Sequence, residues 1–280
     1  MKLSSVVLCC LMSSVSALTA NSSPSSQELT FRQKHIVAIA AYTGQGNLHQ
    51  LRPALNAALD SGLTINEIRE VLVHSYAYCG FPRSIRGLQA FISVLDKRKS
   101  RGITDAPGRD ASPLKDKRSR YNRGCAILAE LSGVPANAPK AAYAEFAPVM
   151  ERFLKEHLFA DIFERDVLTY DERELATVSI LAAIGGVEPM ARSHMDICLN
   201  LGITPGQLCQ LLDIVSLNIG PGEADAVRKE LNTLLQERGL PGVSGTGQVA
   251  GKRETPANPP LRRRRENPAK HRSLAWNRSR

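Results

Sequence analysis

The chain has 280 residues, 43% of them hydrophobic, and a formal net charge of +9. This length and apolar content exclude a mainly disordered chain and allow two domains of about 100 residues. The positive charge is concentrated in residues 97–123, with net +7, and residues 241–280, with net +8, which leaves net −6 elsewhere. A mildly acidic folded part is not expected to bind nucleic acid specifically.

The first element in the chain is typical of a secretory signal. Within residues 1–20, Lys2 precedes an apolar run from Val6 to Met12, and small residues suitable for cleavage follow at Ala17 and Ala20. The apolar run is too short to span a membrane as a helix. We therefore expect a secreted or periplasmic protein.

The rest of the chain contains the same pattern of helix signals twice. The pair Leu-Thr occurs at residues 29–30 and again 139 residues later, and Gly-Leu/Ile-Thr occurs at residues 62–64 and again 140 residues later. Each copy contains two Ser/Thr-x-x-Glu/Gln capping boxes. In such a box the Ser/Thr hydroxyl accepts from the backbone NH of the Glu/Gln, and the Glu/Gln side chain accepts from the backbone NH of the Ser/Thr. The four boxes are Thr30 with Gln33, Thr64 with Glu67, Thr169 with Glu172, and Thr204 with Gln207.

Apolar residues between these caps recur with the helical period. In the first copy they predict helices that begin after Thr30 and stop near Gly44 and Gly46, then helices over 48–59, 65–78 and 85–95. In the second copy they predict a helix ending at Gly185-Gly186, then helices over 188–199 and 205–217. No alternating run is long enough for a sheet, so the fold class is all-α, two helical repeats in tandem.

These elements divide the chain into five predicted segments. A first helical domain covers 28–98, a basic linker 99–140, and a linking helix with the second domain 141–237. Residues 238–280 have too little apolar content to fold and are predicted to be a disordered basic tail. This tail is expected to be solvated, and contact with polyanions is its alternative role.

Four cysteines lie outside the predicted signal, namely Cys79, Cys125, Cys198 and Cys209. In an exported chain they allow one or two disulfides. Their apolar neighbours are equally consistent with four buried free thiols. The sequence leaves both states open.

Several stretches resemble the carboxymuconolactone decarboxylase family, within the alkylhydroperoxidase D-like superfamily. The similar stretches are 173–176, 185–189, 192–194 and 202–204 in the second copy, 76–84 in the first, and 146–148, 153–159 and 161–163 between them. The resemblance covers residues 28–98 and 143–236. It implies an all-α fold whose units associate, so a trimer of this tandem chain would imitate a hexamer.

The peroxidase branch of this superfamily uses Cys-x-x-Cys-x-x-x-His with an upstream Glu. When that pattern is laid on His194, its two cysteines fall on Val187 and Met190. Because the chemistry needs two thiols one helical turn apart, the missing pair disfavours peroxidase activity. The first copy has Ala54 where His194 would lie.

The residues that remain in the second copy suit acid–base chemistry. We expect His194 and Glu174 to be catalytic, since an imidazole beside a carboxylate moves protons near neutral pH. Glu174 lies one position away from where the superfamily pattern would place its Glu. Arg192 and Glu188 are candidate substrate-binding residues, because an arginine can hold a carboxylate substrate through two hydrogen bonds. The alternative for His194 is a surface or interface residue bonded to a carbonyl.

In the first copy, polar residues bracket the Phe81-Pro82 turn. His74, Tyr78 and Arg83 are candidate substrate-binding residues that line a pocket of a neighbouring unit. The alternative is that they hold two helices together where the chain turns. Glu67 and Glu70 are expected to be first-turn charges that complement the helix dipole.

The sequence thus favours cofactor-free acid–base chemistry on a small carboxylated lactone or oxo acid. This is the chemistry of a carboxy-lyase. The alternative from another class is a non-catalytic oligomeric scaffold. No metal is expected, because His157 and Asp161, four residues apart, do not close a site by themselves. The expected partners are a small organic acid or lactone and further copies of the chain.

Overall fold

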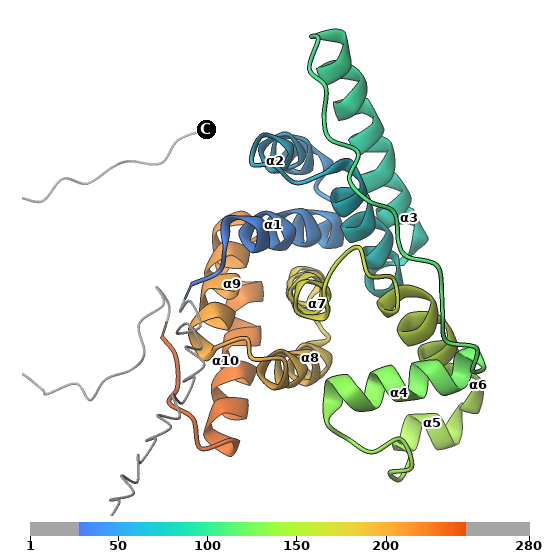
Figure 1. Cartoon of the computed structure of the whole chain (residues 1–280). Helices are drawn as coiled ribbons and strands as arrows, with labels where there is room; N and C mark the ends of the chain where they lie inside the picture. Colours follow the sequence, from blue (N-terminus) through green and yellow to red (C-terminus); the bar gives the residue numbers. More distant parts are fainter. Residues whose placement is uncertain (1–27, 245–280) are drawn as a thin grey trace, which may run out of the picture. The chain divides into compact units, whose positions relative to one another are not determined.

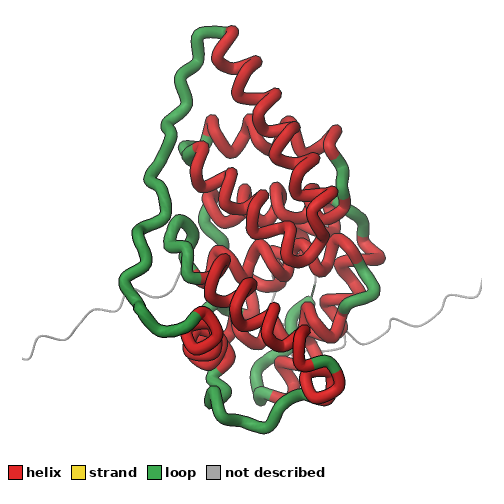
Figure 2. The backbone as a smooth tube through the Cα atoms, turned by 90° about the vertical axis from the view of Figure 1, so that its right-hand side faces the viewer, coloured by secondary structure: helices red, strands yellow, loops and turns green. Residues whose placement is uncertain are grey.

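The computed structural model describes residues 28–244, so the predicted signal and most of the predicted tail lie outside the described residues. The described residues form helices joined by loops and contain no β-strand, which confirms the all-α prediction (Figure 2). None of these helices combines the length and apolar character needed to cross a membrane. The first copy contains α1 (Phe31–Gln45), α2 (Leu48–Asp60) and α3 (Ile65–Ser100), and the second contains α7 (Tyr170–Ile184), α8 (Glu188–Asn200), α9 (Pro205–Asn218) and α10 (Pro221–Glu237).

Between the copies lie α4 (Arg120–Ser132), α5 (Ala142–Phe146), α6 (Pro148–Phe153) and η1 (Leu154–Phe163), a π-helix. The predicted basic linker therefore contains a helix of its own. Several of its basic side chains form ion pairs within the chain, such as Arg109 with Asp166 at 3.0 Å and Arg123 with Glu164 at 2.9 Å.

The predicted helix starts are confirmed. At Thr30, Thr64 and Thr204 the side chain accepts from the third residue of the helix, whose own side chain accepts from the cap NH. At Thr169 the backbone NH donates to Glu172 at 3.1 Å. The one-residue slip between the copies lies in the first loop, because two residues separate α1 from α2 and three separate α7 from α8.

The two helices predicted over 65–78 and 85–95 are the two halves of α3. They meet at Gly80, whose φ of 79° and ψ of 162° are not helical and favour glycine. Beyond this turn the halves pack against each other, since the Ser84 hydroxyl donates to the Leu72 carbonyl at 2.7 Å. Gly220 separates α9 from α10 at the corresponding position of the second copy.

The two copies share their hydrophobic cores through α1 and α7, which lie next to each other (Figure 1). A Cβ atom on Gly44 of α1 would come within 3.1 Å of the Cα of Ile180 on α7, so the two backbones approach closely. Ile180 and Ala176 belong to the core of the first copy, while Val37 and Ala41 of α1 belong to the core of the second. Neither core is complete without a helix from the other copy.

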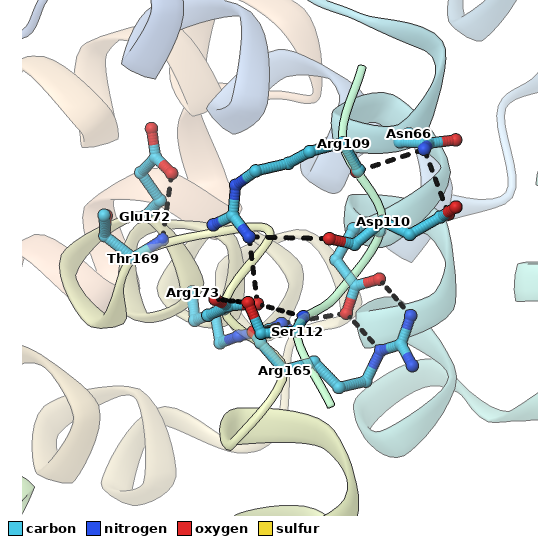
Figure 3. A network of polar contacts seen from close by, with 10 residues as sticks. Asn66, Arg109, Asp110, Ser112, Arg165, Thr169, Glu172 and Arg173 are labelled. Carbon is cyan, nitrogen blue, oxygen red and sulfur yellow. Dashed lines mark hydrogen bonds and ion pairs between the residues drawn. The ribbon is translucent and has the colours of Figure 1, made fainter. Parts of the chain in front are cut away.

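The segment after α3 is fastened to both copies (Figure 3). Ala106 and Pro107 accept from the backbone NH groups of Ile65 and Asn66, two of the donors that a helix start leaves unpaired. The Asn66 amide also donates to the carbonyls of Gly108 and Arg109. Further along, the Ser112 backbone NH and hydroxyl donate to Asp166, just before α7. The segment thereby connects the start of α3 to the loop that precedes α7.

Between the two copies, α4 and η1 pack against each other with almost no space at Gly124. A Cβ atom there would lie 1.7 Å from the carbonyl oxygen of Lys155. Since the obstacle is backbone, it cannot move aside as the end of a flexible side chain could. The glycine at 124 therefore sets the distance between these two helices.

We predict that Gly124→Ala lowers the free energy of unfolding by about 1–3 kcal/mol, the usual cost of overpacking. Gly222→Ala is the matched control, because a Cβ at Gly222 in the first turn of α10 meets nothing within 4 Å. Urea denaturation of both variants checks this. Equal stability of the two variants would contradict the close approach of α4 and η1.

Candidate functional site

His194 and Glu174 lie together, as the sequence predicted. His194 projects from α8 and its Nδ1 donates to Oε2 of Glu174 on α7 over 2.7 Å. The Glu174 side chain is fully buried, whereas the His194 side chain is 15% exposed. The contact forms although Glu174 lies one position away from the superfamily pattern. With Nδ1 engaged, Nε2 of His194 makes no hydrogen bond to a described residue.

Tyr78, from α3 of the first copy, completes this cluster. Its ring stands edge-on to His194, with ring centroids 5.6 Å apart and planes at 83°. Its hydroxyl is buried without a hydrogen-bond partner, and so is Oε1 of Glu174. Burial, and then the negative charge of Glu174, raise the pKa of Tyr78 well above 10, so the phenol keeps its proton. A buried donor and a buried acceptor without partners are rare in folded proteins, and such groups often mark a site.

The cluster has no counterpart in the first copy. The position equivalent to Glu174 holds His35 and the one equivalent to His194 holds Ala54, so the first copy lacks the carboxylate at the one and the imidazole at the other. Conversely, the second copy has Asn218 where the first has Tyr78. The described residues therefore build this site from unlike halves, with two side chains from one copy and one from the other.

His74 lies behind Tyr78 and is fully buried. The Thr177 hydroxyl donates to the Arg173 carbonyl at 2.9 Å, so it accepts from Nε2 of His74, which lies 2.9 Å away. An Arg173 NH group lies 3.4 Å from Nδ1 of the same ring. Burial, and then the positive charge of Arg173, hold the pKa of His74 well below its ordinary value. His74 is thus a neutral ring that supports Tyr78, with centroids 5.3 Å apart.

Sequence reasoning missed the ion pair beneath this ring. The sequence predicts Glu70 to be a first-turn charge that complements the helix dipole, but it lies beyond the first turn, and its side chain, only 1% exposed, accepts from Arg173 and Arg165, each at 2.8 Å. Burial works to raise the pKa of Glu70, but its hydrogen bonds and ion pairs with the two arginines outweigh burial and hold it below its ordinary value. The only signal was the position of Glu70 in the second turn of a helix, among apolar residues.

The structure does not bring the other predicted residues to His194. Arg192 turns toward α10, where it pairs with Glu237 and, at 3.7 Å, with Glu230. Glu188 accepts from the backbone NH of Gly186 at 2.9 Å, at the start of α8. Arg83 donates to the carbonyl of Gly44 and so ties the turn after Gly80 to the end of α1.

The four described cysteines are free thiols. Burial raises the pKa of Cys79 to about 11, and it raises the pKa of Cys198 well above its ordinary value. A thiol that attacks peroxide must ionise first. These two cysteines are therefore poorly suited to that chemistry. Among the described residues no group of three His, Cys, Asp or Glu side chains is arranged to hold a metal ion.

The comparisons with known proteins agree with a tandem helical fold of this class. A model of the Carboxymuconolactone decarboxylase family matches residues 16–92 and 148–229, together more than half of the chain. The chain therefore belongs to this family, with two family units in tandem. It is also similar to the 4-carboxymuconolactone decarboxylase of Acinetobacter baylyi, with 24% identity over 122 residues, which cover 43% of this chain and 90% of that protein.

The buried neutral state of His74 makes a prediction about pH. Below pH 6.5 the unfolded chain takes up a proton that the folded chain refuses, so stability falls as the pH drops from 7 to 5. The slope contributed by His74 is at most about 1.4 kcal/mol per pH unit. In His74→Gln, whose amide can still donate to Thr177, this part of the slope disappears.

Urea denaturation at pH 5, 6 and 7 measures the slope in both proteins. Burial also lowers the pKa of His35, so a smaller dependence on pH remains in the variant. Identical slopes for the two proteins would show that His74 is not held neutral by the fold.

Proposed function

We propose that Glu174, His194 and Tyr78 form a cofactor-free acid–base site that decarboxylates a small carboxylated lactone or a related oxo acid. The observation that carries this proposal is the buried Glu174, which holds His194 through one oxygen and leaves the other without a partner. The name of the similar Acinetobacter protein supports the choice of 4-carboxymuconolactone as the first substrate to test.

The reaction breaks the bond between a ring carbon and the carboxylate. Its electron pair moves into the conjugated lactone and generates an enolate and CO2, and one proton must then be added to carbon. With Nδ1 bonded to Glu174, the ring of His194 is oriented so that Nε2 can deliver that proton. The negative charge of Glu174 stabilises the ring while it carries the extra proton, and the exposed edge allows exchange with solvent.

Tyr78 has the complementary role in this proposal. Its phenol stays protonated because of burial and the charge of Glu174. A hydrogen bond from this hydroxyl to the enolate oxygen would stabilise the charge that develops there, in a buried place where such bonds act strongly. The unpartnered hydroxyl therefore has a use in the transition state that it lacks in the free protein.

One prediction of this mechanism concerns the two proton-transfer residues. Glu174→Gln and His194→Ala are each expected to lower kcat for CO2 release from 4-carboxymuconolactone by about 100- to 10,000-fold, the range of a lost general acid or base. His49→Ala is the matched control, an exposed histidine on α2, the helix that corresponds to α8. Circular dichroism verifies the fold of each variant. Turnover by His194→Ala equal to that of the control would exclude this mechanism.

A second prediction separates a catalytic Tyr78 from a merely structural one. Tyr78→Phe removes a hydroxyl that has no partner, so stability should be unchanged or slightly higher. In contrast, kcat should fall about 100-fold, as for loss of one oxyanion donor. Calorimetry and the CO2 assay measure the two effects. Full activity in this variant would remove Tyr78 from the mechanism, and a stable wild-type protein inert toward lactones would favour the scaffold role.

A further inference from the structure

The helices that precede α7 line a cavity. It has a volume of about 450 Å³ and is lined by α4, the loop after it, α5, α6 and the start of η1. Most of this wall comes from residues 125–144, which lie outside both stretches matched by the family. The cavity is therefore a feature of the inserted segment rather than of the repeated unit, and its size falls within the range of small-molecule sites.

Most of the cavity wall is apolar. The apolar lining residues include Leu128 and Ala129 of α4, Leu154 of η1, and Val134 and Pro135 of the loop. Such a wall favours the apolar body of a ligand, because burial removes apolar surface from water on both partners.

One end of the cavity is cationic. Glu151 accepts from Lys140 at 2.7 Å and from Lys155 at 2.6 Å, and Lys155 also donates to the Tyr121 hydroxyl at 3.3 Å. Two ammonium groups thus share one carboxylate, which leaves a net charge of +1. Hydrogen bonds with the two lysines lower the pKa of Glu151 to about 2, so this carboxylate stays ionised.

The two ammonium groups also have hydrogen-bonding capacity to spare. Each can donate three hydrogen bonds. Lys140 makes one such bond and Lys155 makes two, and both side chains line the cavity. A bound carboxylate could accept the remaining N–H groups without displacing Glu151.

We infer that this cavity binds a small amphiphilic organic anion, with its apolar body against α4 and η1 and its carboxylate at Lys140 and Lys155. The net positive charge disfavours a cationic ligand. The site is distinct from the proposed catalytic cluster, because none of Tyr78, Glu174 and His194 lines the cavity.

Isothermal titration calorimetry with the full chain tests this inference. The probes are octanoate and benzoate, each paired with its neutral amide. We expect both carboxylates to bind at least tenfold more tightly than their amides. Ala129→Trp, which fills the cavity, should abolish binding, and Lys155→Met, which keeps the length of the side chain, should weaken carboxylate binding at least tenfold. Lys140→Met is a second charge variant in case Lys155→Met unfolds.

His194→Ala is the control that separates the two sites. It should leave octanoate binding unchanged even though the proposed function requires it to lose activity, so the two proposals fail independently. Bound octanoate should also slow alkylation of Cys125, which lines the cavity, as followed by mass spectrometry. Absence of carboxylate binding, equal affinity for acid and amide, binding that survives Ala129→Trp, or loss of binding in His194→Ala would each overturn the inference.

Discussion

The geometry of the site depends on the buried ion pair between Arg173 and Glu70. Arg173 has no exposed side-chain surface and Glu70 has 1%, and the pair joins α7 of the second copy to α3 of the first. Removing one partner from such a pair leaves an unpaired buried charge and typically costs about 3–5 kcal/mol. Glu174 is the next residue on α7, and His74, which contacts Arg173, supports Tyr78. The pair therefore fixes α3, which supplies Tyr78, relative to α7, which supplies Glu174.

This arrangement explains how a duplicated chain can hold a single site. The repeat preserves what makes the scaffold, namely the helix caps and the glycine turns, while the reactive groups differ between copies. His194 and Glu174 belong to one copy and Tyr78 to the other, and Ala54 and His35 stand at the equivalent positions. Each core also contains residues from a helix of the other copy, so the two copies pack as one body. Side chains that differ between the copies can therefore meet in one site.

Local patterns were sufficient to predict much of this. Capping boxes and glycine stops depend on neighbours a few residues away, so the helices of both copies could be read from the sequence. The contact of His194 with Glu174 was also predictable, since both lie on adjacent helices of one copy. Arg192, which the sequence groups with them, pairs instead with Glu237 of α10. The partners of Glu70 lie 95 and 103 residues further on, and no local pattern shows which helix a buried carboxylate will meet.

The central claim is that one site is assembled around His194 from both copies. The most direct test is a crystal structure of the protein with a saturated carboxylated lactone, which resembles the proposed substrate but lacks the conjugation needed to lose CO2. We predict that the lactone binds between Nε2 of His194 and the hydroxyl of Tyr78. Binding of this analogue elsewhere, with the cluster around Glu174 left empty, would contradict it.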